Sequence, residues 1–157
     1  MDVTRNLLAA TGLAWLMLYT TPASVAAAQL LDGTVVHVRL LSPISSEDAK
    51  AGDRIGFIVI RDVVADGVVV IPRGTPAEGA VVRAQRSSWG FTRHRAVLAF
   101  GFTQTTGLDG QLIRLRASNT NGQVNIDRSD YHHGLQWASE GDTFEAFVIG
   151  NYGLRGR

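Results

Sequence analysis

The stretch GVVVIPRGTPAEGAVV (Gly67–Val82) places two runs of apolar, mostly β-branched residues on either side of a short hinge. Pro72 and Pro76 cannot donate to a sheet ladder, so they are expected at a turn or at an edge crossing. Gly74, between them, can adopt the positive φ that a tight turn requires. The stretch therefore predicts two strands joined by a structural turn. The other interpretation, an active loop, finds no support in these residue types.

The remainder of the chain repeats this organisation. Apolar residues alternate with polar ones at the period of a β-strand, or form short apolar runs, in seven segments. These segments are Thr34–Leu41, Arg54–Asp62, Val68–Ile71, Glu78–Gln85, Arg95–Gln104, Gln111–Ala117 and Asp142–Gly150. Tight-turn signals separate several of them, including Ala65-Asp66-Gly67 and Gly107–Gly110. The sequence predicts an all-β fold, a single compact β-barrel or sandwich of about seven strands.

The alternation also predicts which side chains face the core. In Arg54–Asp62, the residues Ile55, Phe57 and Val59 share one face. In Glu78–Gln85, the pattern places Ala80, Val82 and Ala84 inward, and their neighbours outward.

Two segments interrupt the alternation. Ser45–Asp53 has Ser45 followed three residues later by Asp48, which allows either one helical turn or a polar loop. Residues 118–141 form a long polar segment, of the kind that is usually functional or mobile. Within it, Gln123–Ile126 could form a short strand.

The first 28 residues have the layout of a secretory signal peptide. Arg5 precedes the apolar stretch Leu7–Tyr19, and Ala26-Ala27-Ala28 before Gln29 fits a cleavage site. The alternative, a membrane anchor, would need roughly 20 apolar residues, and this stretch is shorter. We expect residues 1–28 to be the signal peptide and 29–157 the β-barrel domain, located in the periplasm, outside the cell or elsewhere in the envelope.

Composition excludes several functions. The chain of 157 residues has no cysteine, so disulfides and thiolate metal sites are ruled out. Its formal net charge is +1 and it has no basic block, so nucleic acid is not an expected partner. No cofactor is predicted, and no transmembrane span is expected in the mature chain.

The best binding candidate is an aromatic-basic loop, SSWGFTRHR (Ser87–Arg95). Exposed aromatic and Arg side chains can stack on a sugar, grip an anionic polymer or anchor an interface. The alternative is a hairpin loop whose aromatic rings cover the end of the barrel. The predicted contact residues are Trp89, Phe91, Arg93, His94, Arg95, Tyr131 and Trp137.

Catalytic and metal sites have weaker support. His132 and His133 are the only metal-ligand candidates, and adjacent strand residues point to opposite faces, so the two do not readily share one ion. Serines and His94 could be drawn into a triad, but the chain has no GxSxG elbow. Glu47, Asp48 and Asp53 are expected to be solvated loop charges. We therefore predict a protein that is not an enzyme.

A series of short motifs lies between Gly33 and Ser118: Gly33-Thr34, Ile44-Ser45-Ser46, Gly52-Asp53, Asp62-Val63, Ile71-Pro72-Arg73-Gly74-Thr75 and Gly79. This series resembles that of small exported bacterial β-barrel proteins of uncharacterised role. More distantly, it resembles the C-terminal β-barrel of the conjugal TrbI-like scaffold family of type IV secretion systems. The resemblance implies an exported barrel in which the IPRGTP turn links two strands. That family also inserts a helical hairpin across the outer membrane, and residues 118–141 are too polar for one here.

The leading functional hypothesis is a non-enzymatic envelope module that binds a protein partner or a cell-surface polymer. One alternative is a structural component that self-assembles as a homo-oligomer in a secretion- or conjugation-type envelope complex. The remaining alternative is a polysaccharide or peptidoglycan hydrolase, which the absence of a convergent constellation disfavours.

Overall fold

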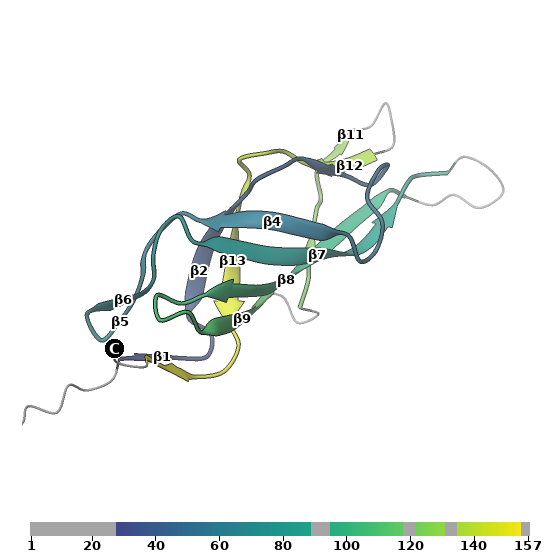
Figure 1. The fold of residues 1–157 in the computed structure, drawn as a ribbon. Coiled ribbons are helices and arrows are strands. Elements are labelled where there is room, and N and C mark those ends of the chain that lie inside the picture. Colours follow the sequence, from purple (N-terminus) through teal and green to yellow (C-terminus); the bar gives the residue numbers. More distant parts are fainter. Residues whose placement is uncertain (1–27, 89–94, 118–121, 131–134, 155–157) are drawn as a thin grey trace, which may run out of the picture.

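The computed structural model describes residues 28–88, 95–117, 122–130 and 135–154, and this part of the chain contains strands and no helix (Figure 1). The strands are β1 (Gln29–Leu30), β2 (Val35–Leu40), β3 (Ile44–Ser45), β4 (Arg54–Val59), β5 (Val63–Ala65), β6 (Val68–Ile71), β7 (Pro76–Gln85), β8 (Val97–Thr106), β9 (Leu112–Ala117), β10 (Val124–Asn125), β11 (Ser129–Asp130), β12 (Leu135–Ala138), β13 (Thr143–Val148) and β14 (Tyr152–Gly153). No helix within these ranges is long and apolar enough to cross a membrane.

Six strands close into an antiparallel barrel in the order β8-β7-β4-β2-β13-β9, because β9 pairs back onto β8. β10 adds to the edge of β8 as a seventh strand. The predicted all-β fold of about seven strands is confirmed, and it is a barrel and not a sandwich. Figure 1 shows β11 and β12 at one end of the barrel, and β1, β5 and β6 at the other.

The barrel is filled by side chains, with a cluster of four phenylalanines in its interior. Phe57 lies 5.0 Å from Phe102 and 5.6 Å from Phe100, measured between ring centroids. Phe144 meets Phe100 edge-on at 5.1 Å. Aromatic pairs of this geometry add about 0.5–1.5 kcal/mol each beyond the area that they bury. Since the chain has no disulfide, this core has to hold the barrel together.

The hinge of the opening stretch is a turn, as predicted. Gly74 has φ 89°, and the Thr75 hydroxyl donates to the Pro72 carbonyl at 2.7 Å. The turn is fixed to the barrel because the Gly74 N–H donates to the Val59 carbonyl. Its polar groups are therefore engaged in holding β6 and β7 in place.

One predicted face was wrong. In β7 the buried residues are Ala77, Gly79 and Val81, whereas Val82 is 49% exposed. The pairing of β7 with β8 shifts register at Glu78/Gly79 and again at Val81/Arg83. At the first bulge the extra residue is Thr103 of β8, so Ala77, Gly79 and Val81 stay on one face of β7. At the second bulge the extra residue is Val82 of β7, and beyond it the partly buried Ala84 faces the core as predicted.

The short strands lie at the two ends of the barrel. β1 pairs with β14, and β5 with β6 forms a hairpin whose turn residues Asp66 and Gly67 both have positive φ. This hairpin exposes Val64 and Val68. The segment 118–141, predicted as a long polar loop, contributes β10, β11 and β12. Most of the predicted signal peptide lies outside the described residues.

Candidate binding groove

Most of the predicted contact residues cannot be placed. Two of them can: Arg95 is exposed just before β8, and Trp137 lies in β12 with 36% of its surface exposed. Those outside the described residues are Trp89, Phe91, Arg93, His94 and Tyr131, together with the metal candidates His132 and His133.

Trp137 is held at the barrel end by the pairing of its strand. β12 pairs with β11 on one side and with β3 on the other, where Trp137 lies opposite Ser45. The neighbouring Ala138 is buried in the core, so the strand alternation turns the indole outward.

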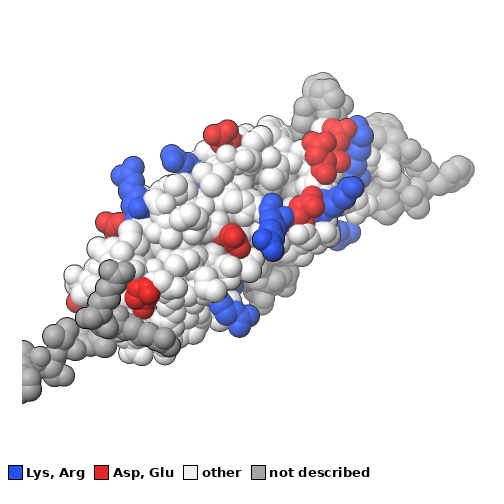
Figure 2. Space-filling model, in the orientation of Figure 1, with Lys and Arg blue, Asp and Glu red and all other residues white. Residues whose placement is uncertain are grey.

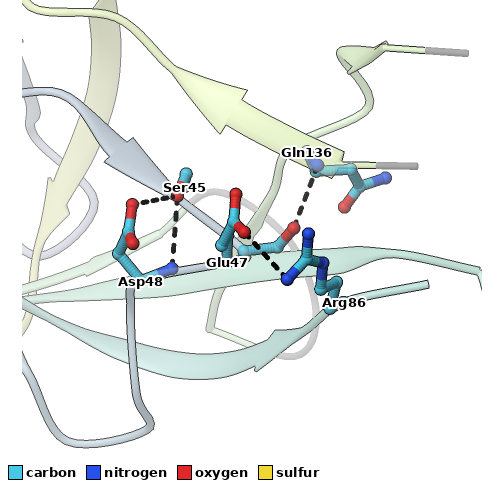
Figure 3. Close-up of polar contacts among 6 residues, drawn as sticks. Ser45, Glu47, Asp48, Arg86 and Gln136 are labelled. Atoms are coloured by element: carbon cyan, nitrogen blue, oxygen red, sulfur yellow. Dashed lines mark hydrogen bonds and ion pairs between the residues drawn. The ribbon is translucent and has the colours of Figure 1, made fainter. Parts of the chain in front are cut away.

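The segment after β3 fastens β12 to the barrel, as Figure 3 shows. The backbone N–H of Gln136 donates to the Ser46 hydroxyl at 3.0 Å, and the Ser46 N–H donates to the Gln136 carbonyl at 2.8 Å. The side-chain oxygen of Gln136 accepts from the N–H of Leu98 at the start of β8. Three hydrogen bonds of Gln136, two with Ser46 and one with Leu98, therefore hold β12 against the barrel.

The acids of this segment are engaged locally, not gathered into a site. Glu47 pairs with Arg86 at 2.8 Å, and the Ser45 hydroxyl donates to Asp48 at 2.8 Å (Figure 3). The Ala49 N–H donates to the Ser45 carbonyl, which closes a single turn and starts no helix. The segment therefore contains the single turn that one of the two interpretations allowed, and the Ser45 hydroxyl caps it by accepting from the Asp48 N–H.

Beside Trp137 lies an open groove of about 430 Å³, which runs between the β10 segment and the start of β13. Its lining residues are Val124, Asn125, Ile126, Asp127, Arg128, Trp137, Asp142, Thr143 and Phe144. Phe144 belongs also to the core cluster, so its half-buried ring connects the groove to the barrel interior.

The groove lies where the barrel wall divides. β13 pairs with β9 only from Ala146 to Val148, and among the described strands Thr143–Glu145 pair with β2 alone. β8 likewise passes from β9, at its Gln104–Thr106 end, to β10 at Ala99 and Phe100. β8 and β13 both pair with β9, and beyond the end of β9 they have no common neighbour.

A network of three side chains fixes one wall of the groove. The guanidinium of Arg128 lies over the Trp137 ring, 5.7 Å from its centroid. The same guanidinium donates to Asp142 Oδ2 at 2.9 Å, and this oxygen also accepts from the Ser139 N–H at 2.8 Å. The indole is consequently oriented by a cation–π contact with Arg128, and Arg128 is held in turn by its ion pair with Asp142.

The sequence analysis identified Trp137 and missed its partners. Arg128 and Asp142 are separated by 14 residues, and no local spacing marks them as neighbours. Phe144 follows a core alternation, which gives no indication that its ring also lines a groove.

The described residues contain no group of three or more His, Asp or Glu side chains that could hold a metal ion. On the face shown in Figure 2, basic and acidic side chains are interspersed, and neither sign forms a continuous patch.

A search of the solved structures found a distant match. The chain resembles ComB10 of the Com type IV secretion system of Helicobacter pylori. The TM-score is 0.46 and the sequence identity 11%, over 80% of this chain and 89% of that one. Both this match and the resemblance of the sequence motifs are to proteins of type IV secretion systems. No protein-family model matches the chain, and no curated protein matches it.

Proposed function

We propose that this chain is an exported, non-enzymatic module of the bacterial envelope, which binds a protein partner or a cell-surface polymer through the groove beside Trp137. The observation that carries the proposal is the groove itself. Among the described residues, an indole, a phenyl ring and several polar side chains line one hollow beside the closed ring of six strands. Ligand sites commonly combine aromatic walls with a few fixed polar groups.

Two observations favour binding over hydrolysis. Asp142 Oδ2 already accepts hydrogen bonds from Arg128 and from the Ser139 backbone. A general acid or base needs a carboxyl group free to exchange a proton with substrate, with a second group positioned across the bond to be cleaved. Of the two carboxylates lining the groove, only Asp127 is free of such partners among the described residues.

The location in the envelope is part of the proposal. Its support is the signal-peptide layout of residues 1–28, with Arg5 before the apolar stretch Leu7–Tyr19. We propose that the mature protein is located in the periplasm or at the cell surface.

Retention on envelope material tests the proposed function. The chain is produced in a bacterial host, purified, and sedimented with washed envelopes of that host. We expect Trp137→Ala to weaken retention about tenfold or more, because exposed aromatic anchors dominate interfaces. Leu31→Ala is the matched control, since Leu31 is a large apolar residue, 55% exposed, and does not line the groove. Equal retention of the two variants and the original chain would contradict the proposal.

A second candidate function is self-assembly as a structural component of a secretion- or conjugation-type envelope complex. The β5–β6 hairpin favours it, because within the described residues these strands form a separate two-stranded sheet that exposes Val64 and Val68. Strands with open edges and exposed apolar side chains are prone to pair with another chain. The mass of the particle in solution separates this candidate from the first.

A further inference from the structure

The charges in the groove oppose a polyanionic ligand. Its lining contains two carboxylates, of Asp127 and Asp142, and one guanidinium, of Arg128. The guanidinium is paired with Asp142 at 2.9 Å, so its positive charge is already compensated, and the three groups together carry one net negative charge. A polyanion would therefore meet the unpaired carboxylate of Asp127 without a compensating cation. This favours a neutral ligand over nucleic acid or a phosphate-bearing polymer.

The apolar part of the lining consists of two aromatic residues, Trp137 and Phe144, and two aliphatic residues, Val124 and Ile126. Trp137 remains 36% exposed although Arg128 lies over its ring, and the half-buried Phe144 ring continues the wall toward the core. The face of an aromatic ring is electron-rich. A pyranose ring presents C–H groups on its faces, and these pack on an indole while the hydroxyls at the ring edge remain free.

The polar part of the lining supplies both donors and acceptors. The Asp127 carboxylate and the Thr143 hydroxyl have no hydrogen-bond partner among the described residues. Asn125 accepts from Gln123 through its Oδ1, which leaves its amide N–H groups as donors. Neighbouring hydroxyls of a sugar both donate and accept, so they need this mixture of partners.

We propose that the groove binds the pyranose rings of a neutral glycan, with Trp137 as the stacking surface and Asn125, Asp127 and Thr143 as hydrogen-bond partners of the hydroxyls. The inference rests on the proposed function and specifies its ligand. The volume of about 430 Å³ lies within the usual range for ligand sites, and the groove is open, so a chain of sugars can continue beyond it.

Titration with neutral oligosaccharides tests the inference directly. The probes are chitotetraose, cellotetraose and maltotetraose, with tetragalacturonate as the anionic counterpart. Binding is measured by calorimetry and by the NMR signal of the Trp137 indole N–H. We expect at least one neutral probe to bind and to shift this signal, and the anionic probe to bind about tenfold more weakly or not at all.

Two substitutions at one position separate stacking from folding. Trp137→Ala should weaken the binding about tenfold, whereas Trp137→Phe, which retains an aromatic face, should stay within about threefold of the original affinity. An unchanged thermal transition in Trp137→Phe shows that the barrel is intact. If Trp137→Ala bound the neutral probe as well as the original chain does, the stacking role would be overturned.

The envelope assay distinguishes failure of this inference from failure of the proposed function. Envelopes are treated either with a protease or with a muramidase and periodate, and then offered to the original chain. A glycan ligand predicts that protease leaves retention intact and that glycan destruction removes it. Retention that depends on Trp137 but is lost only after protease treatment would overturn the glycan and leave a protein partner. The loss of any dependence on Trp137 would overturn both proposals.

Discussion

Gly79 lies in β7 opposite Phe102 of β8, at one of the two bulges in that pairing. A Cβ at this position would come within 2.5 Å of the Gly101 carbonyl oxygen and 2.9 Å of the Phe57 ring. The first of these atoms is backbone and the second belongs to the core cluster, so neither can move without disturbing the barrel. The close approach of two strands here depends on the missing side chain.

We expect Gly79→Ala to lower the free energy of unfolding by about 2–3 kcal/mol, through overpacking against Phe57 and β8. Urea denaturation followed by circular dichroism measures it. The matched control is Gly153→Ala in β14, where a Cβ meets nothing within 4 Å and φ is ordinary. This control should change stability by no more than about 0.5 kcal/mol. Equal effects of the two substitutions would contradict the packing described for β7 and β8.

At the scale of the element, Val81 and Val82 show which side of β7 faces the barrel interior. Val81 is 3% exposed and belongs to the core, and Val82 is 49% exposed. Strict alternation from the sequence assigns them the reverse roles. The chemistry of the two side chains is identical, so any difference between their substitutions comes from facing alone.

Val81→Ala should cost about 2 kcal/mol of unfolding free energy, since it removes buried methyl groups and leaves a cavity. Val82→Ala should cost less than about 0.5 kcal/mol. The pair can be compared in one series of thermal and urea transitions. If Val82→Ala proved the more damaging substitution, the bulges at Glu78/Gly79 and Val81/Arg83 would be misplaced.

The long strands could be predicted from the sequence, and the bulges and two-residue strands could not. Alternation in Arg54–Asp62 predicted the buried faces of Ile55, Phe57 and Val59 correctly, because no bulge interrupts the pairing of β4. A bulge depends on how the partner strand pairs, which a local pattern does not contain. Strands such as β1 and β14 are too short for a period and exist only through their partners.

The groove, too, could be predicted only in part from the sequence. Trp137 could be singled out as an aromatic residue in a polar segment, and its environment could not. Its lining comes from β10, β12 and β13 and from the residues after β10, which meet only because the barrel wall divides beyond β9. Residues 89–94 of the loop Ser87–Arg95, the best binding candidate in the sequence, lie outside the described residues, and the role of this loop stays a prediction.

At the scale of the whole molecule, a closed barrel leaves few strand edges for assembly. Six of the strands satisfy one another in a ring, and among the described residues the open edges belong to short strands such as β5, β6 and β10. Self-association would have to use these edges, of which the β5–β6 hairpin carries the most exposed apolar surface.

We expect the purified chain to have the mass of a single molecule at micromolar concentration, measured by light scattering on a sizing column. The groove is formed within one chain and needs no second copy. A particle of ring size would contradict this and would favour the assembly candidate. In that case the double substitution Val64→Ser and Val68→Ser should dissociate the particle into single chains. The control Val82→Ser should not, because Val82 is similarly exposed but lies in β7.

The pairing of β1 with β14 has a mechanical consequence. Gln29 lies opposite Gly153, and the Leu154 N–H donates to the Ala28 carbonyl, so both ends of the described chain leave the barrel side by side. Tension applied through these ends would load the hydrogen bonds between β1 and β14 one after another, and next those between β2 and β13. Bonds loaded in sequence yield at a lower force than bonds that share the load. We therefore expect the barrel to unfold at a lower force when it is pulled through its two ends than when it is pulled across its strands.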